Sequence, residues 1–250
     1  MDEFDGFDGF DGFEGFDAAP GTLDAAGLAG QAVQMCLSAA SLHLGDADDR
    51  GRRLATPEPG DAWLAILAVD ALIDALLPLV DTETATALGA SLGRLLAAFP
   101  ARYPAYQAPL PLTLTSRLSQ HGQTVTPPAP VPTAAAPRPG APAEPVKVDA
   151  LVHLLFHAFV TVAGQHLGDP LPAGHRLAAP DPEEARLCLT LAGSLYAQLF
   201  DRLSPQAAET WRAELAAMLD RFEDAAAPAG APVADLTAVA AAAWADVEAT

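Results

Sequence analysis

The chain has 250 residues, 51% of them hydrophobic, and a formal net charge of -19 from 13 Lys and Arg against 32 Asp and Glu. That apolar fraction is enough for a buried core, and the negative charge would repel nucleic-acid phosphates and anionic membrane surfaces. We therefore expect a folded protein that binds neither nucleic acid nor membranes.

The amino terminus is an acidic tail built on a triplet of Phe, an acidic residue and Gly. Its phenylalanines are Phe4, Phe7, Phe10, Phe13 and Phe16. Glycine at every third position opposes a stable helix or strand, so residues 1–20 are predicted to be disordered. Two interpretations stay open: a multivalent motif that binds a basic protein partner, or a tail that only adds solubility. Because the first residues include no basic and apolar leader, we expect a cytoplasmic location.

An internal repeat follows the tail, with a constant shift of 123 residues. The segment His43-Leu44-Gly45-Asp46 recurs as His166-Leu167-Gly168-Asp169. The same shift aligns loop prolines, such as Pro57 with Pro180, and many leucines further along the chain. The sequence therefore predicts a tandem duplication, with one copy in residues 24–100 and the other in residues 148–224.

Each copy is predicted to contain three helices. The first helix, about residues 24–44 or 148–167, stops before Gly45 or Gly168, which suits the left-handed position after a helix end. The second helix follows Glu58-Pro59 in one copy and Asp181-Pro182 in the other, and aspartate is the better cap.

The third helix of each copy is predicted to begin after a capping side chain, Asp81 or Ser204. Apolar residues then recur at helical spacing. The expected buried stripe is Leu88, Leu92, Leu95 and Phe99 in the first copy and Trp211, Leu215, Met218 and Phe222 in the second.

The first helix of each copy is apolar over most of its circumference, with a narrow polar stripe. The stripe is His153, His157 and Thr161 in one copy and Gly30, Gln34 and Ser38 in the other. Such a helix needs more cover than two neighbours of its own copy supply. We therefore predict an all-α fold: two pseudo-equivalent three-helix repeats packed as one pseudo-twofold bundle, with the two first helices at its centre.

Two further segments are assigned by composition. Residues 101–147 are rich in Pro and Ala and are predicted to be a linker that favours extended polyproline II structure. Residues 233–248 place Val233, Leu236, Val239 and Trp244 along an Ala-rich helix, which we expect to pack back on the bundle.

The residues that could carry chemistry are few. His153 and His157 lie four residues apart, a spacing that lets two imidazoles reach one metal ion, but no acidic residue or third ligand completes a known motif. His43 and His166, next to the helix ends, are expected to interact as imidazolium ions with the helix carboxyl termini. Cys36 and Cys188 are expected to be buried thiols.

Phosphate-binding loops, nucleophile elbows and paired cysteines are also lacking from the sequence. We therefore expect a protein that is not an enzyme and uses no cofactor.

The second copy resembles a bacterial family known as domain of unknown function eighteen forty-four. The resemblance is carried by Leu151-Val152-His153 through His166-Leu167-Gly168-Asp169, then by Pro182-Glu183-Glu184-Ala185-Arg186-Leu187 and Leu203-Ser204-Pro205-Gln206, and it ends at Phe222. It implies a helical fold and a bacterial origin, and it assigns no catalytic residue. The duplication, the tail and the linker depart from the family's pattern.

Together these features predict a non-enzymatic interaction or scaffold protein that recruits a basic protein partner through its tail. The alternative is a helical bundle that binds a small molecule or a metal ion through His153 and His157.

Overall fold

A computed structural model describes residues 25–48, 50–77, 79–106, 147–171 and 174–226. The predicted tail (1–20), residues 107–146 of the predicted linker and the predicted final helix (233–248) lie outside the described residues. The described part is all-α, as predicted from the sequence. Its elements are α1 (Ala25–His43), α2 (Pro59–Leu76), α3 (Thr82–Arg102), α5 (Val148–His166), α6 (Pro182–Leu199), the 3-10 helix η1 (Phe200–Arg202) and α7 (Pro205–Ala226).

The helix ends lie where the predicted caps place them. Gly45 and Gly168 both have a positive φ, 97° and 98°, directly after α1 and α5. The Asp181 side chain accepts a hydrogen bond from the Glu183 N–H at the start of α6, whereas Glu58 makes no such bond at the start of α2. The predicted difference between these two caps is confirmed.

The third helices also have the predicted caps. Asp81 accepts a bond of 2.7 Å from the Thr84 N–H before α3, and Ser204 accepts one of 3.2 Å from the Ala207 N–H before α7. However, α3 continues through Pro100 to Arg102, so the segment predicted as linker begins with the end of a helix.

His43 and His166 each connect the end of one helix to the start of the next. Both are buried, and Nδ1 of each accepts a backbone N–H at 3.1 Å, from Glu58 and from Asp181 respectively. A ring nitrogen that accepts a hydrogen bond carries no proton, whereas both nitrogens of an imidazolium donate. The structural role expected for these histidines therefore stands, but the predicted imidazolium charge is wrong.

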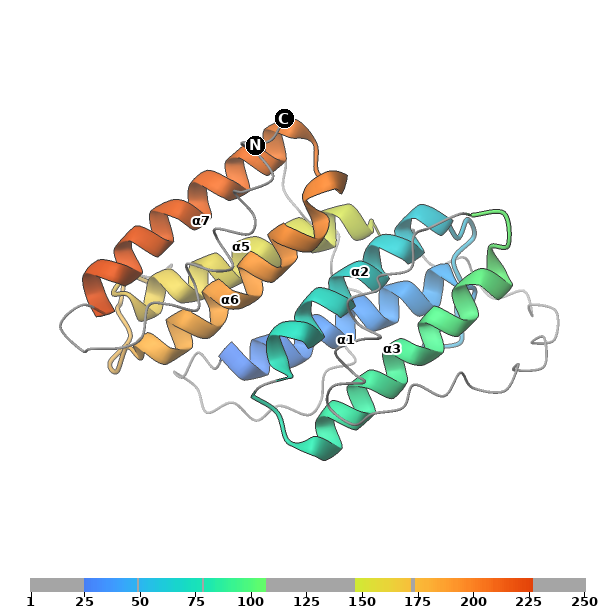
Figure 1. Cartoon of the computed structure of the whole chain (residues 1–250), viewed down its shortest axis with the longest axis horizontal. Helices are drawn as coiled ribbons and strands as arrows, with labels where there is room; N and C mark the ends of the chain where they lie inside the picture. Colours follow the sequence, from blue (N-terminus) through green and yellow to red (C-terminus); the bar gives the residue numbers. More distant parts are fainter. Residues whose placement is uncertain (1–24, 49, 78, 107–146, 172–173, 227–250) are drawn as a thin grey trace.

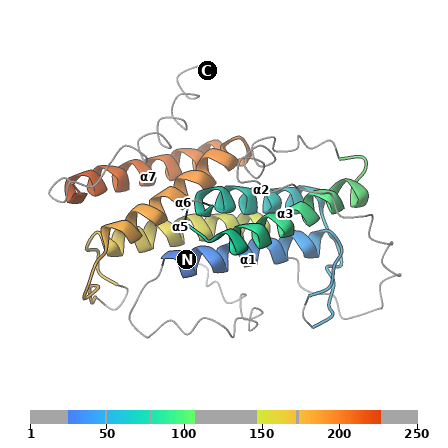
Figure 2. The same cartoon turned by 60° about the horizontal axis from the view of Figure 1, so that its bottom comes forward.

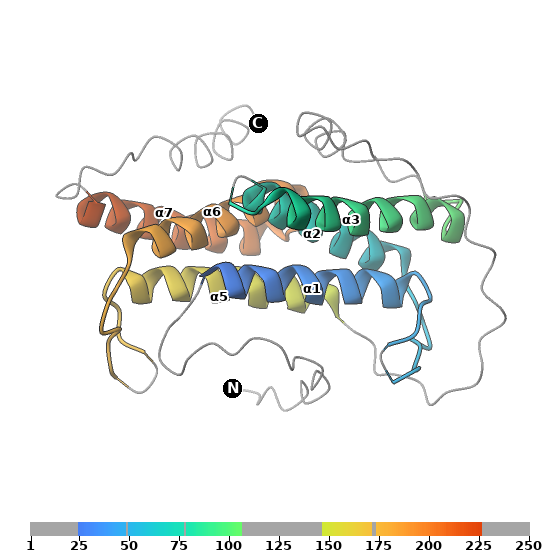
Figure 3. The ribbon, with the colours of Figure 1, turned by 90° about the horizontal axis from the view of Figure 1, so that it is seen from below.

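The helices are arranged in two layers (Figure 3). One layer holds α1 and α5, which run side by side in opposite directions, and the other holds α2, α3, α6 and α7. In Figure 1, α2 and α6 occupy the middle while α3 and α7 lie at opposite edges. Figure 2 shows α1 along one edge of the bundle and α7 along the other.

The second helices, rather than the first, form the centre of the bundle. The most extensive contact between the two halves of the chain joins α2 to α6, and 13 of the 18 residues of α2 are buried. By contrast, α1 and α5 meet over a small area. The prediction of central first helices is wrong because their polar stripes face solvent: Gln34, Ser38 and Thr161 are exposed.

Hydrogen bonds between described residues join the halves across this core. The backbone N–H of Ala25, at the start of α1, donates to Glu184 of α6 at 2.7 Å. The Gln198 amide of α6 donates to the buried carboxylate of Asp70 in α2 at 2.8 Å. Loss of either partner would remove a hydrogen bond from a polar group in a buried place, so Asp70 and Gln198 help fix how α2 lies on α6.

Of the helices that the structure describes, α5 alone is long and apolar enough to cross a membrane by length and composition. More than half of it is buried against other helices. Most of its apolar side chains, among them Phe156 and Phe159, belong to the core that the six described α-helices share.

Candidate functional site

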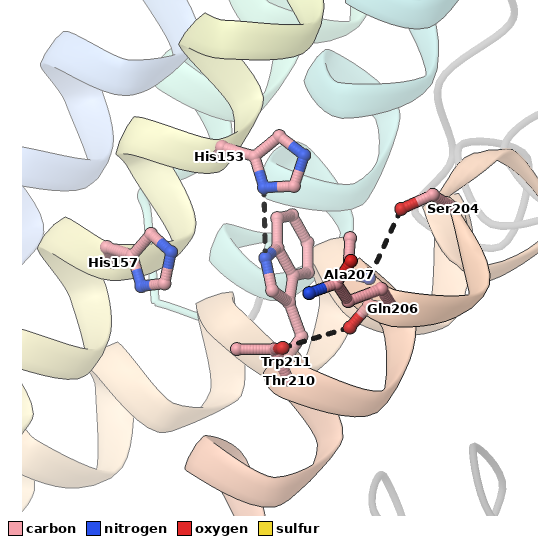
Figure 4. A pocket seen from close by; sticks show the side chains of 7 residues that line it. All are labelled: His153, His157, Ser204, Gln206, Ala207, Thr210 and Trp211. Atoms are coloured by element: carbon pink, nitrogen blue, oxygen red, sulfur yellow. Dashed lines mark hydrogen bonds between the residues drawn. The ribbon is translucent and has the colours of Figure 1, made fainter.

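An open pocket of about 250 Å³ lies between α5 and the start of α7, and both histidines of the α5 stripe line it (Figure 4). The figure shows His153 and His157 on one side, with the beginning of α7 opposite. The full lining is His153, His157, Ser204, Gln206, Ala207, Thr210 and Trp211.

His153 is held by the indole of Trp211. The Trp211 Nε1–H donates to His153 Nδ1 at 3.1 Å, and the two rings meet edge to face. Trp211 in turn stacks on Phe156, with ring centroids 4.0 Å apart and an interplanar angle of 3°. Nδ1 of His153 is therefore unprotonated, and its proton lies on Nε2, which is 3.6 Å from an Asp149 carboxylate oxygen.

His157 is the more accessible of the two histidines. Its side chain is 47% exposed, and its Nδ1 lies 3.0 Å from Oε2 of Glu214 on α7. This contact makes a hydrogen bond when the ring is neutral and an ion pair when it is protonated. An exposed pair of this kind adds little to stability. The contact between His157 and Glu214 could therefore break, and the two side chains could bind a ligand, with little loss of stability.

The hydroxyl groups that line the pocket make hydrogen bonds with the backbone at the start of α7. Ser204 caps the Ala207 N–H, and the Thr210 hydroxyl donates to the Gln206 carbonyl at 2.9 Å. Both contacts are drawn in Figure 4. They position the first turn of α7 against the two histidines.

No protein-family model, curated protein or solved structure matches this chain. Its function must therefore be argued from its own residues. The resemblance to domain of unknown function eighteen forty-four stays a prediction.

The structure brings His153 and His157 to one pocket, as their spacing predicts. Within the described residues, no three His, Cys, Asp or Glu side chains converge as the ligands of one metal ion. The two thiols lie elsewhere and are buried, and burial raises the pKa of Cys36 and of Cys188 to about 12. A thiol with so high a pKa is a poor nucleophile at neutral pH. The five tail phenylalanines lie outside the described residues.

The helical spacing predicts Trp211 only as a core residue and does not indicate its contact with His153. A signal lies at the positions 123 residues earlier, which hold Gly30 and Leu88. Residues 153 and 211 are therefore a ring acceptor and an indole donor, whereas residues 30 and 88 are neither. Such a paired change indicates two side chains in contact.

Proposed function

We propose that this chain is a non-enzymatic interaction protein, in which a duplicated helical scaffold carries an acidic, Phe-rich tail that recruits a basic protein partner. The observation that carries the proposal is the distribution of charge. Residues 1–20 hold seven acidic residues and no Lys or Arg, while the described body holds nineteen acidic residues against eleven Lys and Arg. Tail and body therefore repel each other, which favours a basic partner for the tail.

The duplicated scaffold is supported by structural features that recur after 123 residues. The bounds of α5 and α6 equal those of α1 and α2 plus 123, and α7 begins 123 residues after α3. In the part of the chain that the structure describes, the four glycines with positive φ pair in the same way, as Gly45 with Gly168 and Gly51 with Gly174. A shared ancestor of both halves explains why loops with different sequences keep the same turns.

A pseudo-twofold relation between the halves is supported by contacts that recur across the core. Glu184, at the start of α6, accepts the first N–H of α1. Its counterpart at the start of α2 is Asp61. Burial raises the pKa of Asp61; His43 lowers it, and the charges of Glu58 and of Asp149, in the first turn of α5, raise it further. Each second helix thus begins beside the first helix of the other half.

The polar groups of the body that could serve chemistry instead hold helices together. His43 and His166 accept hydrogen bonds that hold the loops, and Gln198 donates one to Asp70 that joins the halves. Trp211 donates a hydrogen bond to His153. This use of its polar groups supports a scaffold over a catalyst.

The tail is tested by affinity purification from the native host with two variants of the whole chain. One lacks residues 1–18, and the other changes the five Phe to Ser while all acidic residues stay. If the phenylalanines enter pockets on a partner, both variants lose a basic protein that the wild type retains. Retention of the same proteins by both variants would contradict the proposal. Circular dichroism should show the wild-type helical signal in each variant.

A second candidate function is ligand or metal binding at the pocket, which one observation favours. His157 Nδ1 and Glu214 Oε2 are 3.0 Å apart, a separation that suits two neighbouring ligands of one transition-metal ion. Zinc or nickel should then raise the melting temperature of the wild type and not that of His157→Ala. Gln34→Ala, at the position 123 residues earlier, is the matched control, because Gln34 is exposed on α1. A flat response of the wild type to both metals rejects this candidate.

A further inference from the structure

The two helices of the α1 and α5 layer carry almost no charge along their own length. Four helices cover one side of this layer, and no described helix covers the other (Figure 3). The 19 residues of α1 include no Asp, Glu, Lys or Arg, and those of α5 include only Asp149. In a chain of net charge -19, two adjacent surface helices with a single charge are unusual.

Uncharged side chains are exposed on this face. Gln34 and Ser38 of α1 are exposed, as is Thr161 of α5. Leu154 is 52% exposed and is one of two large hydrophobic residues of the described chain exposed to this degree, the other being Leu79 at 54%. Next to these residues, Leu28 and Met35 are partly exposed while they pack on the core.

The near absence of charged residues on α1 and α5 indicates which kind of partner this face can bind. A basic protein or an anionic membrane would be attracted to acidic or basic side chains, and the face offers almost none. A second copy of this acidic chain would be repelled by every strongly charged surface of the first. On the α1 and α5 face, two copies can meet without opposing like charges, and each offers the other the same mixture of leucine, methionine and neutral hydrogen-bonding groups.

The size of the face suits a small dimer interface. A helix of 19 residues is about 28 Å long and about 10 Å wide, so the pair presents roughly 560 Å². Two such faces bury roughly 1,100 Å² together, just above the area of about 1,000 Å² that a specific interface needs. An interface of this size gives a dimer that dissociates on dilution.

We propose that two copies of this chain associate through the outer faces of α1 and α5, about a twofold axis, with Leu154 buried in the contact. In such a symmetric interface each face contacts its own equivalent, so a single substitution changes the contact twice. The association uses the helical body and does not depend on the tail.

Sedimentation velocity on the full chain tests the dimer, with Leu154→Glu and a matched control, Leu79→Glu. Both leucines are about half exposed, so neither substitution should unfold the protein, which circular dichroism checks. The wild type and Leu79→Glu should change from a species of 25.7 kDa to one of twice that mass as concentration rises. Leu154→Glu should weaken dimerisation by about tenfold or more, because each copy would bury a carboxylate in the contact. A wild type that stays monomeric at all concentrations, or a Leu154→Glu dimer of unchanged affinity, overturns the proposal.

A thiol reporter on the same face tests whether another segment of the chain covers it. The native thiols are buried, so a cysteine introduced by Ser38→Cys on α1 can be labelled selectively, and Ala90→Cys on the exposed side of α3 serves as the control. In a dimer through this face, the Ser38→Cys thiol is labelled rapidly in dilute solution and slowly in concentrated solution, and the control is labelled rapidly in both. Slow labelling of the Ser38→Cys thiol at every concentration would show that the chain covers its own face and would overturn the proposal.

Discussion

Two buried histidines, His43 and His166, hold the loops that connect the first helix of each half to the second. His166→Leu and His43→Leu should each lower the free energy of unfolding by about 1–3 kcal/mol, because the N–H of Asp181 or Glu58 loses its acceptor in a buried place. Asparagine should retain part of the stability, since its side-chain oxygen lies near the position of Nδ1. Urea unfolding measures both effects, with His175→Leu as a control at an exposed histidine. A loss below 0.5 kcal/mol, which is roughly the scale of surface substitutions, would contradict the assigned hydrogen bonds.

Two tyrosines allow a matched test of what a buried hydroxyl contributes. The Tyr103 hydroxyl donates to the His43 carbonyl at the end of α1, whereas the buried Tyr196 hydroxyl has no hydrogen-bond partner in the described structure. Tyr103→Phe should therefore destabilise the protein by about 0.5–1.5 kcal/mol. Tyr196→Phe should leave its stability unchanged or raise it, because an unsatisfied polar atom is removed. A buried water that hydrogen-bonds the Tyr196 hydroxyl would reverse this order. Thermal and urea unfolding would then show Tyr196→Phe to be less stable than Tyr103→Phe.

At the scale of helices, α2 and α6 differ in the residue that caps their first turn, Glu58 or Asp181, and substitution can swap these two residues. Glu58→Asp should stabilise the protein by up to about 1 kcal/mol, since the shorter side chain can accept an N–H of α2, as Asp181 does in α6. Asp181→Glu should cost a similar amount. Urea unfolding of the two single variants and of the double variant checks the pair, and the two effects should add because the caps belong to different helices. A Glu58→Asp variant less stable than the wild type would contradict this account.

The helix ends could be predicted from the sequence because the signals are local. Gly45 and Gly168 supply a backbone conformation that few other residues adopt, and a capping side chain acts within three residues of its own position. The packing order could not be predicted in the same way. The first helices are rich in alanine and uncharged residues, so their composition resembles that of a buried helix while one face stays open to solvent.

The candidate site was predicted in part for the same reason. The spacing of His153 and His157 places them on one side of α5, which the sequence alone specifies. Their partners, Trp211 and Glu214, come from a helix about sixty residues away, and only the packing of α7 on α5 brings them together. Nothing in the local sequence around either histidine indicates these contacts.

At the scale of the whole molecule, the two halves should form one cooperative body rather than two domains on a linker. The core residues of α2 and α6 belong to a single cluster with those of α1 and α5, and the Asp70–Gln198 and Ala25–Glu184 hydrogen bonds cross between the halves. A site-specific protease sequence inserted within residues 107–146 would allow the chain to be cut after folding. Because each half covers apolar surface of the other, the two fragments should then elute together in size-exclusion chromatography.

The cut protein also shows what the shared core contributes. It should unfold in a single transition whose midpoint depends on protein concentration, because unfolding now releases two chains. Asp70→Ala should lower that midpoint more in the cut protein than in the intact one, since the loss of the Gln198 contact weakens the attachment of the halves as well as their stability. Fragments that separate without denaturant, or that melt independently of concentration, would mean that each half folds alone and that the contact between α2 and α6 is too weak to join them.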